Sequence, residues 1–66
     1  MSYPCNVKFE RYFVSGNLEG LTNSDKMGFM SWNDACKWAG KVTQSPSVDY
    51  VIRTMKNLET GEIAQF

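Results

Sequence analysis

The sequence predicts a single small α+β domain, spanning residues 1–66, with an antiparallel sheet of two β-hairpins and one amphipathic helix packed on one face. Three observations predict it. Apolar and polar residues alternate in stretches near both ends, an apolar stripe with helical period lies between them, and glycine-bearing turns separate the segments. A chain of this length has room for one core, which contributes only about 3–5 kcal/mol of net stability.

The first hairpin is predicted from residues 7–30. In the strand over residues 7–14, one face carries Val7, Phe9 and Phe13 and the other carries Lys8, Glu10 and Tyr12. The loop over residues 15–20 contains two glycines that can adopt positive φ at no steric cost. The returning strand covers residues 21–30, but because residues 23–25 are turn formers, the alternatives are that it is interrupted there or begins only at Lys26.

The helix is predicted to start at Trp32. Ser31 and Asp34 form a capping box, in which the Ser31 hydroxyl accepts from the Asp34 amide. The apolar stripe consists of Trp32, Ala35, Cys36, Trp38, Ala39 and Val42. The small alanines at its centre let the helix approach a sheet closely, with the indoles at the flanks. Because Pro46 lacks a backbone donor, the helix should end before residues 44–47.

The second hairpin is predicted from residues 48–66. Residues 48–56 are rich in β-branched and aromatic side chains, which favours a central strand. Strict alternation places Val48, Tyr50, Ile52 and Thr54 against Val51, Arg53 and Met55. Residues 58–61 match a type I turn closed by Gly61 in the left-handed region, and residues 62–66 return antiparallel.

Composition argues against several functions. The chain has no His and only two distant cysteines, Cys5 and Cys36, so we expect reduced thiols, no metal and no cofactor. Without His the commonest general base is missing, and we expect no enzymatic activity. Seven basic residues balance seven acidic ones, which disfavours duplex DNA as a partner. No signal peptide or membrane span is recognisable, so we expect a cytoplasmic protein.

The favoured function is protein binding. Aromatic residues, Met and Arg are enriched at contact surfaces, and the candidate partner-binding residues of this type are Arg11, Tyr12, Tyr50, Arg53 and Met55. Five other aromatics, unlike Tyr3 and Phe66, are expected to build the core: Phe9, Phe13, Phe29, Trp32 and Trp38. One helix covers only one sheet face, so a second copy of the chain is expected to cover the other in a homodimer. Such a dimer would use the same residues as the expected contact with a partner protein.

Two further hypotheses involve a ligand that carries phosphate groups. A nucleotide or single-stranded nucleic acid would stack on Tyr12, Tyr50 and Trp32, with Lys8, Arg11, Arg53 and Lys56 at the phosphates. The glycine loop over residues 15–20 can offer amides to a phosphate, but it lacks the Lys and the following helix of a P-loop, which favours a plain hairpin loop.

The segments FMSWNDACKWAGKV, residues 29–42, and YVIRTMKNLETGEI, residues 50–63, carry a resemblance. With a single helix between two hairpins, the chain resembles small phage-encoded accessory proteins of the host-takeover or anti-defence type. That resemblance implies stoichiometric binding to a host or phage protein, as an inhibitor or adaptor. It also implies the alternative that the protein sequesters a nucleotide ligand within an oligomer.

Overall fold

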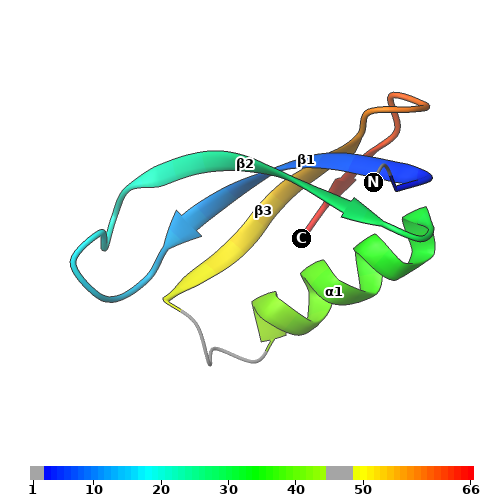
Figure 1. Ribbon diagram of the computed structural model, residues 1–66. Coiled ribbons are helices and arrows are strands. Elements are labelled where there is room, and N and C mark those ends of the chain that lie inside the picture. Colours follow the sequence, from blue (N-terminus) through cyan, green and yellow to red (C-terminus); the bar gives the residue numbers. More distant parts are fainter. Residues whose placement is uncertain (1–2, 45–48) are drawn as a thin grey trace.

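The computed structural model describes residues 3–44 and 49–66 and confirms the predicted α+β architecture. Figure 1 shows two layers, a twisted sheet above and one helix below. The elements in chain order are β1 (Cys5–Phe13), β2 (Thr22–Phe29), α1 (Trp32–Gln44), β3 (Tyr50–Asn57) and β4 (Ile63–Gln65). The predicted connector at residues 45–47 and the predicted strand start at Val48 lie outside the described residues.

One four-stranded antiparallel sheet joins the two hairpins, in the order β2-β1-β3-β4. The two central strands, β1 and β3, pair with each other, as the predicted central position of β3 requires. Strand β2 runs without interruption from Thr22, so the later start at Lys26 is wrong. Pairing with β1 along its whole length outweighs the turn preference of residues 23–25.

The helix begins where its capping box predicts. The Asp34 amide donates to the Ser31 hydroxyl oxygen at 3.1 Å, which satisfies one of the free amides of the first turn. Ala35 and Ala39 are fully buried, and the two tryptophans pack half-buried at the flanks. The helix ends at Gln44, one residue later than predicted, which is within the usual variation of helix ends.

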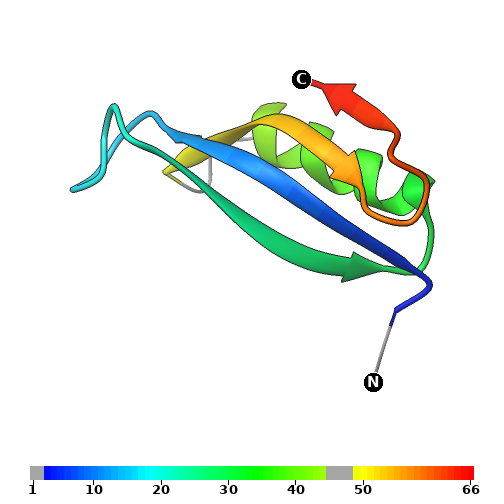
Figure 2. The same cartoon turned by 90° about the horizontal axis from the view of Figure 1, so that it is seen from above.

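The core lies between α1 and the two central strands. Seen from above, α1 lies beneath the side of the sheet that holds β3 and β4, and β2 extends beyond it (Figure 2). The buried cluster consists of Cys5, Val7, Phe9, Ala35, Ala39, Ile52 and Met55. The Phe9 ring meets the Trp38 ring edge-on, with centroids 5.1 Å apart. Among the described residues, no helix is long and apolar enough to cross a membrane.

A β-bulge in β3 overturns the predicted facing of Met55. Glu10 pairs with Thr54 and Arg11 pairs with Ile52, so Arg53 has no partner on β1. An extra residue shifts the side-chain alternation by one position. Met55 therefore lies on the same face as Ile52, fully buried in the core, and the prediction that it lies opposite Ile52 is wrong.

The second turn has the predicted glycine and an additional anchor. Gly61 has φ of 83°, in the left-handed region, as predicted. The buried Asn57 side chain accepts from the Glu59 and Thr60 amides at 2.9 and 3.3 Å. The Gly61 amide donates to the Asn57 carbonyl oxygen at 2.7 Å. Asn57 thus closes the loop between β3 and β4 as an Asx-turn.

Candidate functional site

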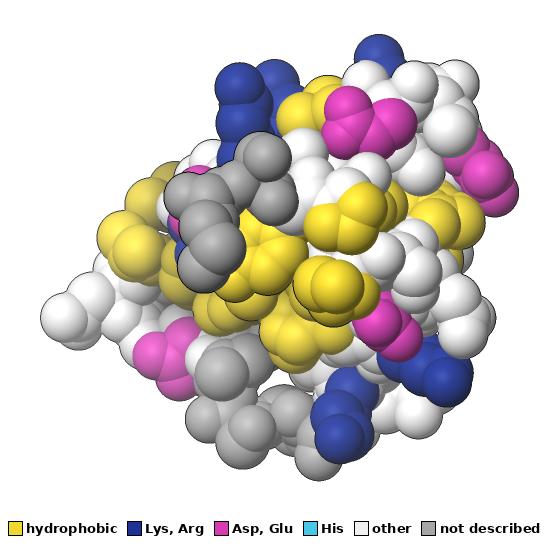
Figure 3. Space-filling model, turned by 45° about the vertical axis from the view of Figure 1, so that its right-hand side comes forward, with side chains coloured by type: hydrophobic (Ala, Val, Ile, Leu, Met, Phe, Trp, Pro, Cys, Tyr) yellow, Lys and Arg dark blue, Asp and Glu magenta, His cyan; other side chains and the backbone are white. Residues whose placement is uncertain are grey.

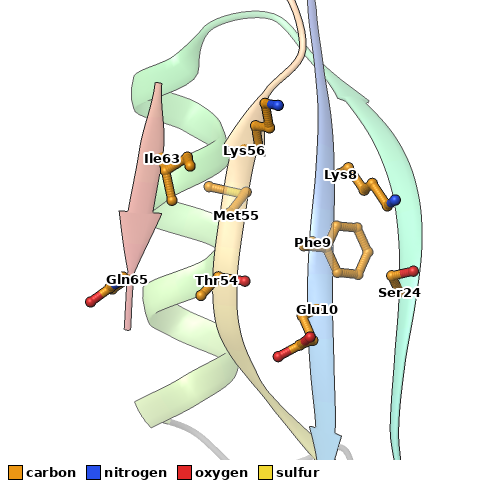
Figure 4. Close-up of a pocket in the computed structure, with 9 residues that line it drawn as sticks. All are labelled: Lys8, Phe9, Glu10, Ser24, Thr54, Met55, Lys56, Ile63 and Gln65. Atoms are coloured by element: carbon orange, nitrogen blue, oxygen red, sulfur yellow. The ribbon is translucent and has the colours of Figure 1, made fainter. Parts of the chain in front are cut away.

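The sheet face opposite α1 is the main candidate surface, and we call it the open face. Figure 4 looks onto it, with α1 behind the sheet. The strand registers assign to it Asn6, Lys8, Glu10 and Tyr12 of β1, Thr22, Ser24, Lys26 and Gly28 of β2, Val51, Arg53, Thr54 and Lys56 of β3, and Ile63 and Gln65 of β4. Most of these side chains are exposed, so this face is accessible in the single chain.

A row of three lysines crosses the open face. Lys8 on β1 pairs directly with Lys26 on β2 and with Lys56 on β3. All three are exposed, and none of them forms an ion pair with any described residue. Like charges directly opposite on neighbouring strands destabilise a sheet, whereas favourable cross-strand pairs contribute about 0.2–1 kcal/mol. The row therefore costs stability in the free protein.

Lys8 and Lys56 of the lysine row line a shallow groove with a volume of about 460 Å³. The side chains along it are labelled in Figure 4, and the polar ones are Lys8, Glu10, Ser24, Thr54, Lys56 and Gln65. Ile63, which is 61% exposed, adds an apolar side chain beside Lys56. The groove thus mixes cations, one carboxylate, hydroxyls and an amide on an open surface.

Tyr12 and Arg53 form a stacked pair farther along the open face. The Arg53 guanidinium carbon lies 4.3 Å from the centroid of the Tyr12 ring, within the range of a cation–π interaction. Tyr12 is half-buried and Arg53 is exposed. The bulge at Arg53 places this side chain on the open face, so that a fourth cation joins the three lysines.

The opposite end of the open face is closed by Tyr3. A Cβ at Gly28 would overlap the Tyr3 ring, so only glycine permits this ring to lie on β2. The Asn6 side-chain amide donates to the Tyr3 carbonyl oxygen and to a Glu59 carboxylate oxygen, both at 3.1 Å. Glu59 therefore lies at the margin of the open face.

The predicted partner-binding residues do not form one patch. Tyr12 and Arg53 lie on the open face, whereas Arg11 and Tyr50 lie on the side of α1 and Met55 is in the core. The Arg11 guanidinium lies 5.2 Å from the Tyr50 ring centroid, and its Nε donates to Asn23 at 2.8 Å. These contacts tie β1, β2 and β3 together, which gives Arg11 and Tyr50 a structural role.

The residues named for nucleic-acid binding are divided in the same way. The open face holds Tyr12, Lys8, Lys56 and Arg53, but Trp32 and Tyr50 pack against the core from the other side. Of the three tyrosine and tryptophan rings expected to stack on bases, only Tyr12 is on the face with the lysines. Its ring is already covered by Arg53.

A second surface lies between β2 and α1. Viewed from the end where β2 leads into α1, hydrophobic side chains gather in the middle of the molecule and charged ones surround them (Figure 3). The Phe29 ring of β2 and the Trp38 ring of α1 have centroids 5.4 Å apart, and Met27, two residues before Phe29 on β2, is 43% exposed. We call Met27, Phe29 and Trp38 the apolar patch.

The two thiols lie on β1 and α1. Cys5 and Cys36 are free, and burial raises the pKa of the Cys36 thiol, with Glu62 and Cys5 adding to the effect. A raised pKa keeps the thiol protonated and lowers its nucleophilicity at neutral pH. No group of three or more His, Cys, Asp or Glu in residues 3–44 and 49–66 can hold a metal ion.

The lysine row was not predicted from the sequence, although the pairing of Lys8 with Lys26 could have been. Lys8 and Lys26 lie equally far along the chain from Asn17, the middle of the first hairpin loop, so a symmetric hairpin pairs them. The position of Lys56 depends on the long-range pairing of β1 with β3 and on the bulge. No local pattern in the sequence signals that register.

Comparisons with protein-family models, curated proteins and solved structures found no match. The surface chemistry described above is therefore the ground for a functional proposal.

Proposed function

We propose that this protein is a small non-catalytic binding protein that inhibits or adapts a partner protein by stoichiometric binding, and that the partner docks on the open face. The observation that carries the proposal is the lysine row, because Lys8 lies directly opposite a like charge on each neighbouring strand, an arrangement that lowers the stability of a sheet. A residue set that costs stability on an accessible face is typical of a functional surface.

The shape and chemistry of the open face support the proposal. The surface is broad and exposed, and the Tyr12–Arg53 pair supplies residue types that often dominate contact energies. The resemblance to small phage-encoded accessory proteins makes a host or phage protein the partner to seek. No step of this function requires a catalytic base, which agrees with a chain that has no His.

The test is co-purification of the tagged protein with its partner from the cells that produce it, followed by variants. Tyr12→Ala and Arg53→Ala should each weaken partner capture by about 1–3 kcal/mol, because each removes half of the stacked pair. The matched control is Lys41→Ala, an exposed residue of α1, which should leave capture unchanged. Unchanged capture by both open-face variants, with the fold intact, would remove the open face from consideration.

The expected homodimer stays a prediction. A two-fold dimer through the open face would bring the lysine rows of the two copies together, which like-charge repulsion opposes. The apolar patch is the better surface for self-association, because its three side chains are all apolar and Met27 among them is exposed. Sedimentation equilibrium of the purified chain tests this directly, and a monomer at all concentrations would contradict it.

A further inference from the structure

The charge of the protein is unevenly distributed, although its net charge is zero. Four of its seven basic side chains lie on the open face: Lys8, Lys26, Arg53 and Lys56. Glu10 is the one carboxylate within that face, and Glu59 lies at its margin. Most of the carboxylates lie elsewhere on the chain. The open face is therefore locally cationic on a neutral molecule.

From this distribution we propose that the open face binds an acidic segment of a partner protein, with carboxylates of the partner opposite the lysine row. The inference rests on the proposed function and names the chemistry of the partner. Charge complementarity of this kind fixes the register of two surfaces and steers their encounter. An acidic partner would also offset the repulsion among Lys8, Lys26 and Lys56, so that binding relieves the cost of the row.

The groove distinguishes an acidic protein segment from a nucleic acid. Glu10 lines the groove, beside Ser24 and Thr54 on the neighbouring strands. An ionised carboxylate only accepts hydrogen bonds, and a phosphodiester backbone offers only acceptors, so Glu10 repels it. A peptide backbone offers N–H donors to Glu10 while its acidic side chains reach the lysines.

Two other observations disfavour a nucleic acid. A nucleic-acid-binding domain is usually strongly basic overall, whereas this chain has equal numbers of basic and acidic residues. Single-strand binding also needs several free aromatic rings among the cations, whereas Arg53 occupies one face of the Tyr12 ring and Tyr3 lies at the far end of the open face. The acidic protein segment is therefore the partner that the open face fits better.

The experiment uses two probes of similar length and charge, a peptide of ten glutamates and an oligothymidylate of ten nucleotides. Each is titrated into the full chain at low ionic strength and followed by amide NMR. The glutamate peptide should shift the signals of Lys8, Lys26 and Lys56, with an affinity that falls as salt is added. Lys8→Glu should weaken this binding at least about fivefold, because it reverses the central charge of the row. Lys37→Glu on α1 is the matched control and should change it less than about twofold.

Three results would overturn the inference. They are tighter binding of the oligothymidylate than of the peptide, peptide shifts that map to α1, and no binding of the peptide at all. Failure of the proposed function is a separate result, because in that case Tyr12→Ala and Arg53→Ala would capture the partner as well as the unmodified protein does. Partner capture that depends on Tyr12 and Arg53 but is unchanged in Lys8→Glu would leave the open face as the binding surface. The proposal that the partner supplies an acidic segment would then be wrong.

Discussion

Met55 shows how one residue depends on a feature that the local sequence hides. It is fully buried in the cluster with Val7 and Phe9, although strict alternation from Ile52 places it on the opposite face. The bulge at Arg53 moves it inward, and the bulge arises from the pairing of β3 with β1. Alternation alone is therefore a reliable guide for β1, where Val7, Phe9 and Phe13 share the core side, but it fails for β3 beyond Arg53.

This placement predicts a large stability effect. Met55→Ala should lower the free energy of unfolding by about 2–5 kcal/mol, because it leaves a cavity in a well-packed core. In a domain this small, that loss can remove most of the net stability. The measurement is urea denaturation followed by circular dichroism. The control is Lys37→Ala, an exposed residue of α1, which should change stability by less than about 0.5 kcal/mol. Equal stability of the two variants would contradict the inward position of Met55.

The elements of the fold were predictable to different degrees. The helix followed from its capping box and apolar stripe, both local features, and only its last residue differed. The hairpin turns followed from Gly16, Gly20 and Gly61, which all have positive φ. The open face was less predictable, because its rows combine residues from four strands whose registers are fixed by long-range pairing. The predicted residues Tyr12 and Arg53 were found on it, but Lys26 was missed as a site residue.

The lysine row leads to a prediction for the sheet as an element. Lys8→Gln should raise the free energy of unfolding by up to about 1 kcal/mol, because it removes the like charge opposite both Lys26 and Lys56. The gain should shrink at high salt, where the charges are screened. Thermal unfolding at low and high salt measures both effects. Lys37→Gln on α1 is the control and should show neither. A destabilised Lys8→Gln variant would show that Lys8 serves the fold, and the main support for a functional open face would be lost.

At the scale of the whole molecule, the core and the candidate binding surface lie on opposite sides of the sheet. α1 and the side of the sheet that faces it hold the core, and the open face is free to carry charges that packing does not require. The net charge of zero does not reveal this arrangement. Carboxylates that lie away from the open face balance its cations in the total. The distribution of charge in the structure is thus the better guide to the partner than the net charge.

The five lysines permit a direct test of the open face as the binding surface. Lys8, Lys26 and Lys56 lie on it, whereas Lys37 and Lys41 lie on α1. All five are exposed, so an amine-reactive reagent should modify each of them in the free protein. The measurement is mass spectrometric mapping of lysine modification with and without the co-purified partner. We expect the partner to protect Lys8, Lys26 and Lys56 and to leave Lys37 and Lys41 as reactive as before. Protection of the two helix lysines, with the three open-face lysines still reactive, would contradict the open face as the docking surface.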